Sequence, residues 1–197
     1  MLAIYEDIEF SVACIVPTYN GRDDLVRLLN SLQRQSTTFD LFVVDSSSTD
    51  GTGELACSQA RSVVTIPSSQ FNHGGTRQMM VSANPSYDIY VFLTQDAYLE
   101  DPDASAHLLR PFIDKQVGAV CGRQLAHLNA SPLAEHARLF NYPATGMVKS
   151  MADAPAGSRL AIAEALTNLV WAPIEQGLKG ISLSANWMWP CRNEGDR

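Results

Sequence analysis

The chain has 197 residues, of which 46% are hydrophobic and 18% are charged, and its formal net charge is -7. This size and composition suit one globular domain with a sizeable core and room for an appendage. The charge argues against a general nucleic-acid binder, because no stripe of lysine and arginine is available to displace counterions from phosphates, whereas a discrete anionic substrate held through a metal is compatible with it.

Apolar runs alternate with stretches of helical spacing along most of the chain. In chain order they predict a strand at 12–16, a helix at 23–35, a strand at 40–45, a helix ending near residue 60, a strand at 62–66, a helix at 76–83, a strand at 88–93, a helix at 104–113 and a strand at 117–121. Such alternation predicts an α/β fold with a doubly wound, mostly parallel sheet and helices on both faces.

The pattern changes after about residue 155. Residues 159–170 predict one short helix, and three tryptophans follow it in a segment that fits no further unit of strand and helix. We therefore divide the chain into a domain at 1–155 and an atypical, poorly defined tail at 156–197. The loss of pattern leads us to expect that the tail is not sequence of the same family, through a shortened chain or a changed reading frame.

The strand predicted at 88–93 runs into Gln95 and Asp96. In an open α/β sheet the ligand crevice lies outside the carboxyl ends of the strands, so a carboxylate there is well placed to hold a cation. One protein carboxylate is enough for Mg2+ when substrate phosphates and waters complete its coordination. The alternative is an ordinary acidic loop residue.

Other polar residues at strand and helix ends could have a role in binding or a local structural role. Asp45 could accept hydrogen bonds from a nucleobase or a ribose, or it could form a turn. Asp50 is predicted to cap a helix. The glycine pair in residues 72–77 could bring backbone N–H groups close to a phosphate, or form a turn. In the same stretch His73 could be a ligand, a base or a local cap, and Arg77 could bind a ligand or form a surface ion pair.

Three motifs in order resemble the nucleotide-sugar half of inverting family 2 glycosyltransferases, which have the GT-A fold. They are Ile-Val-Pro-Thr-Tyr-Asn at 15–20, Val-Val-Asp-Ser-Ser-Ser-Thr-Asp-Gly at 43–51 and Leu-Thr-Gln-Asp at 93–96. The segments at 71–77, 92–97 and 136–142 are similar to the rhamnosyltransferase-like branch of that family. The resemblance spans about residues 12–155.

The resemblance implies roles for the residues that match the family's motifs. Thr18 and Tyr19 stand where the family packs the nucleobase, Asp45 where it hydrogen-bonds the base, and Arg77 where a helix arginine reaches the nucleotide. The implied partners are a nucleotide-sugar donor, such as dTDP-L-rhamnose, and a saccharide or lipid-linked acceptor of polysaccharide biosynthesis.

Gln95 and Asp96 stand where the family has a pair of acidic residues. An amide in the first position suits a ribose contact but cannot neutralise the charge of a metal. The resemblance thus implies a divalent cation, Mg2+ or Mn2+, with Asp96 as its protein ligand. The cation would stabilise the departing diphosphate as a Lewis acid.

The displacement also requires a general base for the acceptor hydroxyl. The family supplies it from an acidic motif in a later segment, and no carboxylate after residue 155 stands in such a context. The catalytic residue is therefore unassigned. Two functions stay open, a glycosyltransferase and a truncated, non-catalytic nucleotide-sugar-binding domain. A flavodoxin-like or receiver domain is disfavoured, because residues 17–20 lack a receiver's acidic cluster and the first loop is not a phosphate cradle.

The widely spaced cysteines and the N-terminus bear on location. Cys14, Cys57, Cys121 and Cys191 form no C-x-x-C pair, and we expect buried thiols in a reducing compartment. Acidic residues stand near the N-terminus where a secretory signal would be positive, and no apolar run approaches the roughly 20 residues that span a bilayer. The sequence predicts a cytoplasmic protein with at most peripheral contact at the inner face of the membrane.

Overall fold

The computed structural model describes residues 10–146 except 128 and 143. These residues fall into two compact units, one ending at Cys121 and the other beginning at Gly122, and each is described by itself. The helix predicted at 159–170 and the tryptophans of the tail lie outside the described residues.

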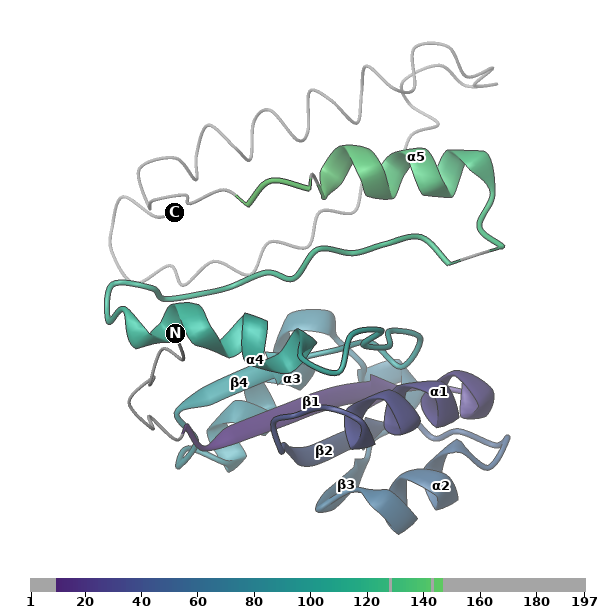
Figure 1. The fold of residues 1–197 in the computed structure, drawn as a ribbon. Helices are drawn as coiled ribbons and strands as arrows, with labels where there is room; N and C mark the ends of the chain where they lie inside the picture. Colours follow the sequence, from purple (N-terminus) through teal and green to yellow (C-terminus); the bar gives the residue numbers. More distant parts are fainter. Residues whose placement is uncertain (1–9, 128, 143, 147–197) are drawn as a thin grey trace, which may run out of the picture. The chain divides into compact units, whose positions relative to one another are not determined.

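The first unit is built on a parallel sheet (Figure 1). Its strands are β1 (Val12–Thr18), β2 (Asp40–Asp45), β3 (Ser62–Thr65) and β4 (Ile89–Phe92), in the order β3-β2-β1-β4. All three neighbouring pairs are parallel. The chain moves outward from β1 to β3 and then crosses to the other side of β1, so the order of strands reverses between β1 and β4. Such a switch point is where ligands bind in open α/β sheets.

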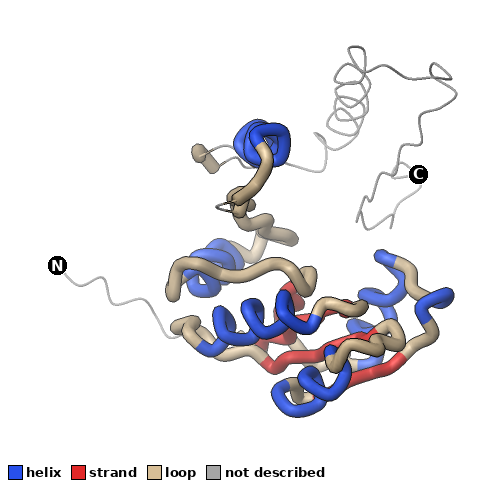
Figure 2. Tube along the Cα trace, turned by 90° about the vertical axis from the view of Figure 1, so that its right-hand side faces the viewer, coloured by secondary structure: helices blue, strands red, loops and turns tan. Residues whose placement is uncertain are grey.

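Both faces of the sheet are covered, as Figure 2 shows for the strands and the helices beside them. The helices of this unit are α1 (Arg22–Gln33), α2 (Thr52–Gln59), α3 (His73–Ala83) and α4 (Ala104–Leu109), with short 3-10 turns at Ser68–Gln70 and Arg110–Ile113. Alternate side chains of a strand point to opposite faces, so the apolar runs of β1 and β2 supply two cores. The predicted fold class is confirmed.

The two cores have different helices. The leucines of α1 and Ala56 of α2 pack on one face, against Cys14, Val16, Leu41 and Val43. Met80 of α3 packs on the other face, against Ala13, Ile15, Phe42 and Val44. Leu109 of α4 joins Val12 and Ile89 in a smaller third cluster.

The fifth predicted strand is wrong. Residues 117–121 form irregular chain, and none of them is buried. Val117 N donates to Asp114 O at 3.0 Å in a turn, and Gly118 has open space where a Cβ would stand. An apolar run forms a strand only where a neighbouring strand offers a free edge, and within the described residues none pairs with this run.

The prediction of buried thiols holds for Cys14 alone among the described cysteines. Burial within β1 raises the pKa of the Cys14 thiol to about 12. Cys57 and Cys121 are exposed instead, because Cys57 lies on the solvent side of α2 and Cys121 lies in the irregular segment. Cys191 is outside the described residues.

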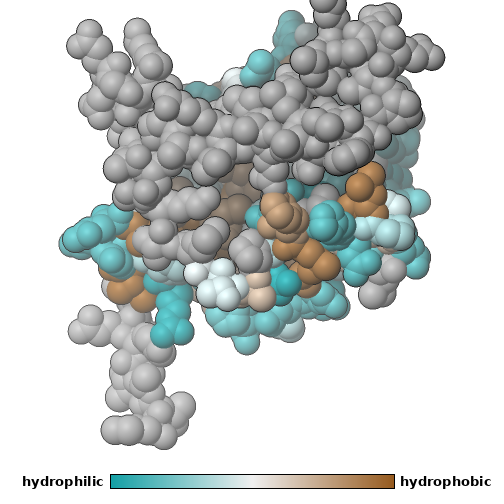
Figure 3. All heavy atoms as spheres, turned by 90° about the horizontal axis from the view of Figure 1, so that it is seen from above, coloured by the Kyte–Doolittle hydropathy of each residue, from teal (hydrophilic) through white to brown (hydrophobic). Residues whose placement is uncertain are grey.

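The second unit contains α5 (Pro132–Asn141), a helix that the pattern of the sequence did not predict. Arg123 Nε donates to Tyr142 O at 3.2 Å near its end. Brown apolar patches interrupt the mostly hydrophilic surface in Figure 3. Exposed large apolar side chains of this unit are Leu125, Leu133, Leu139 and Phe140. Among the described residues, no helix has the length and apolar character needed to traverse a bilayer.

Candidate functional site

The loops after β1, β2 and β4 meet at the carboxyl ends of these strands. Hydrogen bonds join them in two places, one between the first and second loops and one between the first and the loop after β4. All the strand-end residues predicted from the sequence lie on these loops or at the last strand positions. The predicted site residues Thr18, Tyr19, Asp45, Gln95 and Asp96 are therefore brought to one edge of the sheet.

Asp45 is buried, with 3% of its surface exposed, and it braces the ends of β1 and β2. Its Oδ1 accepts from the hydroxyls of Thr18 at 3.0 Å and Ser48 at 2.5 Å, and its Oδ2 accepts from Ser48 N at 2.9 Å. The turn-forming reading of Asp45 is confirmed by these bonds. A carboxylate oxygen has two lone pairs, so Oδ2 keeps acceptor capacity for a ligand.

The first and second loops are further joined through Asn20. Its backbone N–H donates to Ser48 Oγ at 2.9 Å, and its side-chain Oδ1 accepts from Thr49 N at 2.9 Å. Asn20 and Ser47 have φ angles of 44° and 62°, in the left-handed region that few residues other than glycine adopt. Asparagine adopts this region readily, whereas Ser47 is held there by the hydrogen bond from its hydroxyl to Ile66 O at 2.8 Å. Residues held in this way are common at ligand-binding sites.

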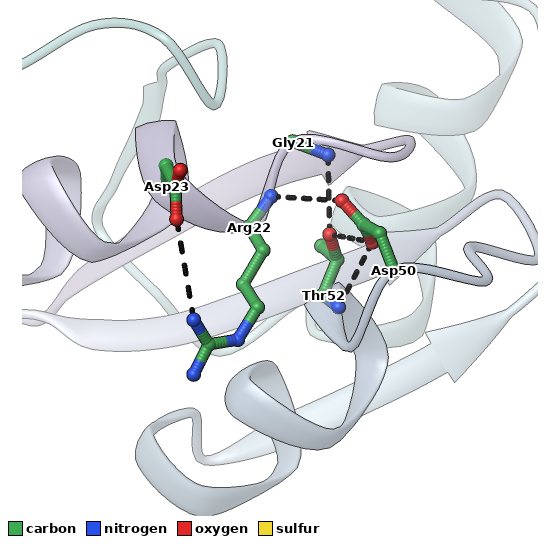
Figure 4. Close-up of polar contacts among 5 residues, drawn as sticks. All are labelled: Gly21, Arg22, Asp23, Asp50 and Thr52. Carbon is green, nitrogen blue, oxygen red and sulfur yellow. Dashed lines mark hydrogen bonds and ion pairs between the residues drawn. The ribbon is translucent and has the colours of Figure 1, made fainter.

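Asp50 connects the first turns of two helices (Figure 4). Its Oδ2 accepts from Arg22 N at 3.1 Å, at the start of α1, while its Oδ1 accepts from Thr52 N at 3.1 Å and Thr52 Oγ1 at 2.5 Å, at the start of α2. Thr52 Oγ1 in turn accepts from Gly21 N at 3.1 Å. The hydrogen bond from the Thr52 side chain is the largest cause of the lowered pKa of Asp50. The predicted structural role near a helix start is confirmed by these bonds, although the N-cap residues of α1 and α2 are Gly21 and Gly51.

Gln95 pairs with the backbone of Tyr19. Its Oε1 accepts from Tyr19 N at 2.8 Å and its Nε2 donates to Tyr19 O at 3.1 Å. A Cβ added at Gly21 would stand 2.1 Å from Gln95 Nε2, so the glycine leaves the space that this amide fills. The ring of Tyr19 is 53% exposed beside the pair. We refer to the two hydrogen bonds as the Gln95–Tyr19 pair.

Asp96 is exposed on a turn closed by Ala97 N and Thr94 O at 3.0 Å. Within the part of the chain that the structure describes, its carboxylate forms no hydrogen bond or ion pair, and no cluster of three metal-binding side chains occurs. A cation at Asp96 would therefore have this one carboxylate as its acidic protein ligand, with the remaining positions left to a ligand and water.

The loop that carries Asp96 is also attached to α1. Leu99 N donates to Ser31 Oγ at 3.1 Å, and Ser31 is fully buried. Gln35 accepts from Ser105 N at 2.9 Å through Oε1 and donates to Asp101 O at 2.9 Å through Nε2. The loop is thus held on both sides of Asp96.

The backbone N–H groups of the glycine pair in α3 are bonded to the side chain of Asn72, which caps the helix. Asn72 Oδ1 accepts from Gly74 N at 3.1 Å and Gly75 N at 2.7 Å, and Asn72 N donates to Thr76 Oγ1 at 3.1 Å. The helix therefore begins at His73, three residues before its predicted start. Because these N–H groups already have an acceptor, the structure favours the local reading of the glycine pair over a phosphate cradle.

Arg77 is half-buried near the N-terminus of α3. Its Nη1 donates to His73 O at 2.8 Å, while its buried Nε has no hydrogen-bond partner and no carboxylate pairs with it among the described residues. The surface ion pair considered for Arg77 is therefore absent there. Burial lowers the pKa of Arg77, and the unsatisfied Nε–H is a cost to the fold, since the atom is enclosed by protein.

Several residues of this edge were missed by reasoning from the sequence. They are Asn20, Gly21, Ser31, Gln35 and Ser48, and each acts through a contact with another loop or helix. The motif at 43–51 held a signal for Ser48, since serine three residues after an aspartate often closes a turn. Ser31 lies within α1 and Gln35 just after its end, and neither carries a local signal.

Comparison with known proteins gives one match over most of the chain. Residues 13–164 match the model of glycosyl transferase family 2. The O-antigen chain rhamnosyltransferase RfbN of Salmonella typhimurium is 45% identical over 144 residues, which cover 72% of this chain and 46% of that protein. The chain thus spans about half the length of the curated rhamnosyltransferases it matches.

A second match covers the end of the chain. Residues 144–197 match the model of the FGAR-AT PurM_N-like domain, and a probable phosphoribosylformylglycinamidine synthase of Caenorhabditis elegans is 35% identical over 104 residues, which cover 47% of this chain and 8% of that protein. The two family models overlap at 144–164. The boundary predicted at residue 155 falls inside this overlap and stays a prediction.

Among solved structures, the mannosyltransferase PcManGT from Pyrobaculum calidifontis, in complex with GDP-Man and Mn2+, is similar with 23% identity. The likeness covers 57% of this chain and 36% of that chain, with a TM-score of 0.46.

Proposed function

We propose, from the premise that the chain belongs to glycosyl transferase family 2, that it carries the donor-binding half of an inverting glycosyltransferase with the GT-A fold. The donor would be a nucleotide sugar, dTDP-L-rhamnose, and the acceptor a saccharide or lipid-linked saccharide of polysaccharide synthesis. The observation that carries the proposal is the edge of the sheet at the carboxyl ends of β1 and β4. There the exposed Tyr19 and the carboxylate of Asp96, which has no partner among the described residues, stand on loops joined to each other.

We assign the residues at this edge of the sheet to different parts of the nucleotide sugar. Tyr19 offers an apolar ring to the base, with Thr18 supporting the wall beneath it. Asp45 would accept a base N–H through the free lone pair of Oδ2. Arg77 would bind the nucleotide's anionic groups through its Nη groups, because no carboxylate among the described residues pairs with it. Gln95 would direct its remaining Nε2 hydrogen to the ribose.

A divalent cation, Mg2+ or Mn2+, fits the chemistry at Asp96. The carboxylate is exposed and forms no ion pair within the described residues, so ligation costs no internal contact. When bound, the cation would supply Lewis-acid stabilisation of the diphosphate leaving group. Asp96 would hold it with oxygens of the diphosphate and water, as hard cations with few protein ligands are commonly held.

The reaction would be a single displacement. An acceptor oxygen forms a bond to the anomeric carbon as the bond to the diphosphate oxygen breaks, and the acceptor proton passes to a general base. Attack opposite the leaving group inverts the anomeric carbon. The residue that takes the proton is not assigned to the described part of this chain. We place the protein in the cytoplasm, with peripheral contact at the inner membrane face where a lipid-linked acceptor would be presented.

A second candidate function is a nucleotide-sugar-binding domain without transfer activity. The strand-end residues discussed above are assigned to the donor and the cation, and none of the described residues is assigned to the acceptor. Both candidates bind the donor, so turnover separates them.

Calorimetric titration of the full chain with dTDP-L-rhamnose, in Mg2+, in Mn2+ and in EDTA, tests donor binding and its dependence on a cation. A parallel assay for dTDP release in the presence of lipid-linked saccharide tests transfer. Cation-dependent binding with release supports the glycosyltransferase, and binding without release supports the second candidate. If the donor binds in none of the three conditions, both candidate functions are contradicted.

A further inference from the structure

We propose that Gln95 is a positioning residue, whose side-chain amide fixes the Tyr19 peptide and thereby sets the place of Asp96 in the crevice. The inference rests on the proposed function in one respect, namely that Asp96 binds a divalent cation. Its geometric part depends on the Gln95–Tyr19 pair, on Gly21 and on the attachment of the Asp96 loop to α1.

The pair uses both halves of the amide. Oε1 accepts from the N–H of Tyr19 at 2.8 Å while Nε2 donates to the C=O of the same residue at 3.1 Å. In the flipped orientation of the amide, Nε2 would face the N–H of Tyr19 and Oε1 would face its C=O, so neither hydrogen bond could form. A carboxylate has no proton to give to the carbonyl, so an ionised acid in this position would make one hydrogen bond and face one repulsive oxygen. The Tyr19 peptide thus selects an amide at this position.

Gly21 indicates how closely the amide fits. Its φ of -138° is negative and thus lies outside the left-handed region that favours glycine. An added Cβ would lie 2.1 Å from Gln95 Nε2 and 2.5 Å from Gln95 Cδ, so the end of the Gln95 side chain would have to leave its place on Tyr19. The loop after β1 therefore has a glycine where the Gln95 side chain crosses it.

Asp96 lies between two fixed points of its loop. On one side, Gln95 ties the chain to the loop after β1. On the other side, Leu99 is bonded to Ser31 of α1, and Asp101 is bonded to Gln35, which follows the end of α1. Removal of the Gln95 amide would break the tie to the loop after β1 and leave the bonds of Leu99 and Asp101 in place. Asp96 would then remain near the crevice while its carboxylate samples more positions, and cation affinity would fall without loss of the fold.

The substitution Gln95→Glu gives a readout that depends on protonation. At pH 7.5 the new carboxylate cannot donate to Tyr19 O, and the Tyr19 N–H should lose protection from hydrogen exchange. Protonated, the acid restores one donor and one acceptor, so protection should return as the pH falls toward the ordinary pKa of glutamate, about 4.3. Gln95→Met, similar in length and without hydrogen bonds, should leave Tyr19 unprotected at both pH values.

Hydrogen exchange of the Tyr19 amide is to be followed in the full chain, wild type and both variants, at pH 7.5 and 4.5, with Mn2+ affinity measured at pH 7.5 by electron paramagnetic resonance. We expect Mn2+ affinity to fall about tenfold in Gln95→Met, the size of effect typical for losing an outer residue that orients a ligand. Unchanged Tyr19 protection in both variants would overturn the proposal, because it would show that the Gln95 side chain does not hold Tyr19. Tighter Mn2+ binding by Gln95→Glu would also overturn it, because it would place the side chain toward the metal.

A double-mutant cycle tests the contact without any ligand. Gly21→Ala should displace the Gln95 amide from Tyr19 and raise the unfolding equilibrium constant several-fold in the wild-type background, about the value of a hydrogen bond, and much less in the Gln95→Ala background, where the space is vacant. Gly53→Ala is the matched control, since a Cβ there meets its nearest atom at an ordinary 3.5 Å. Additive effects of Gly21→Ala and Gln95→Ala would contradict the contact.

Failure of this inference can be told from failure of the proposed function. If the wild type binds neither Mn2+ nor donor, the proposed function fails, and hydrogen exchange and the double-mutant cycle still decide whether Gln95 fixes Tyr19. If the wild type binds both and the Gln95 variants bind them equally well, the positioning role is wrong and the proposed function stands.

Discussion

The Thr18 hydroxyl donates a hydrogen bond of 3.0 Å to the Asp45 carboxylate where two neighbouring strands end. Both residues are buried, and Ser48 occupies two further acceptor positions of the same carboxylate. A contact from Asp45 to a nucleobase would therefore be made by a group already fixed in orientation. Fixing a recognition group before the ligand arrives reduces the entropy lost on binding.

Asp96→Asn should remove cation-dependent donor binding and leave the fold intact. The carboxylate makes no hydrogen bond or ion pair within the described residues, so its loss leaves no internal partner unsatisfied. We expect at least about a tenfold loss of Mn2+ affinity, equivalent to roughly 1.4 kcal/mol. Calorimetry with Mn2+ measures the loss, and circular dichroism checks the fold.

Glu100→Gln is the matched control for Asp96→Asn, because it removes one exposed carboxylate from the same loop. It should bind Mn2+ as the wild type does. Equal losses in the two variants would indicate a general charge effect rather than ligation by Asp96.

Arg77→Met should weaken donor binding while keeping or slightly raising stability. The guanidinium is half-buried and its Nε is unsatisfied among the described residues, so an apolar side chain of similar length removes a desolvation cost. Donor affinity should depend less on salt concentration in the variant, since a cation that faces the ligand is lost. Urea unfolding and donor titration at two salt concentrations measure the two effects.

Arg27→Met serves as the comparison for Arg77→Met. Arg27 is an exposed residue of α1 whose Nη1 lies 3.6 Å from Asp24 Oδ1. Exposed pairs of this kind contribute little, so both stability and donor affinity should stay near the wild type. Marked destabilisation by Arg77→Met would show that its bond to His73 O matters more than its unsatisfied Nε.

Asp50→Ala should destabilise the fold in a way that depends on pH. Hydrogen bonds from Thr52 and Arg22 lower the pKa of Asp50 below its usual 3.8, so the ionised form stabilises the folded state. That stabilisation is fully present above the ordinary pKa and is lost as the pH falls through the lowered value. The difference in urea midpoint between wild type and variant should be greatest above about pH 5 and shrink toward pH 2. A difference that grows on acidification would contradict this linkage.

Leu28→Ala should cost about 2–5 kcal/mol of unfolding free energy, because the side chain is fully buried between α1 and the sheet. Leu133→Ala provides the contrast, since Leu133 is 79% exposed and its truncation should change stability by less than about 0.5 kcal/mol. Chemical unfolding of both variants measures the costs. Similar costs at the two positions would argue against the packing of α1 on this face.

Much of the sheet was predictable because its signals are local. The apolar runs of β1 and β2 and the leucine spacing of α1 each need a window of only a few residues. The run at 117–121 has the same local signal, yet forms no strand, since pairing depends on a neighbour that a window cannot show. The early start of α3 was missed because its glycine pair indicates a loop until Asn72 is known to cap it.

The candidate site was predictable as a set of positions but not as a network. Strand ends placed Asp45 and Asp96 at one edge of the sheet. The partners of those positions could not be read locally, since the two residues of the Gln95–Tyr19 pair are separated by 76 positions in the sequence. The sequence showed that Gln95 stands where the family has an acidic residue. It did not show that the amide of Gln95 bonds to the backbone of Tyr19.

The strand order β3-β2-β1-β4 also has a consequence for how the protein folds. β1 and β2 can pair soon after both have left the ribosome, whereas β1 must wait for β4, which begins at Ile89, before its second edge is covered. Contacts between distant segments form slowly, because a long loop must first be closed. The crevice should therefore be completed late in folding, after the β1–β2 core, and the open edge of β1 is the surface most exposed to mispairing during synthesis.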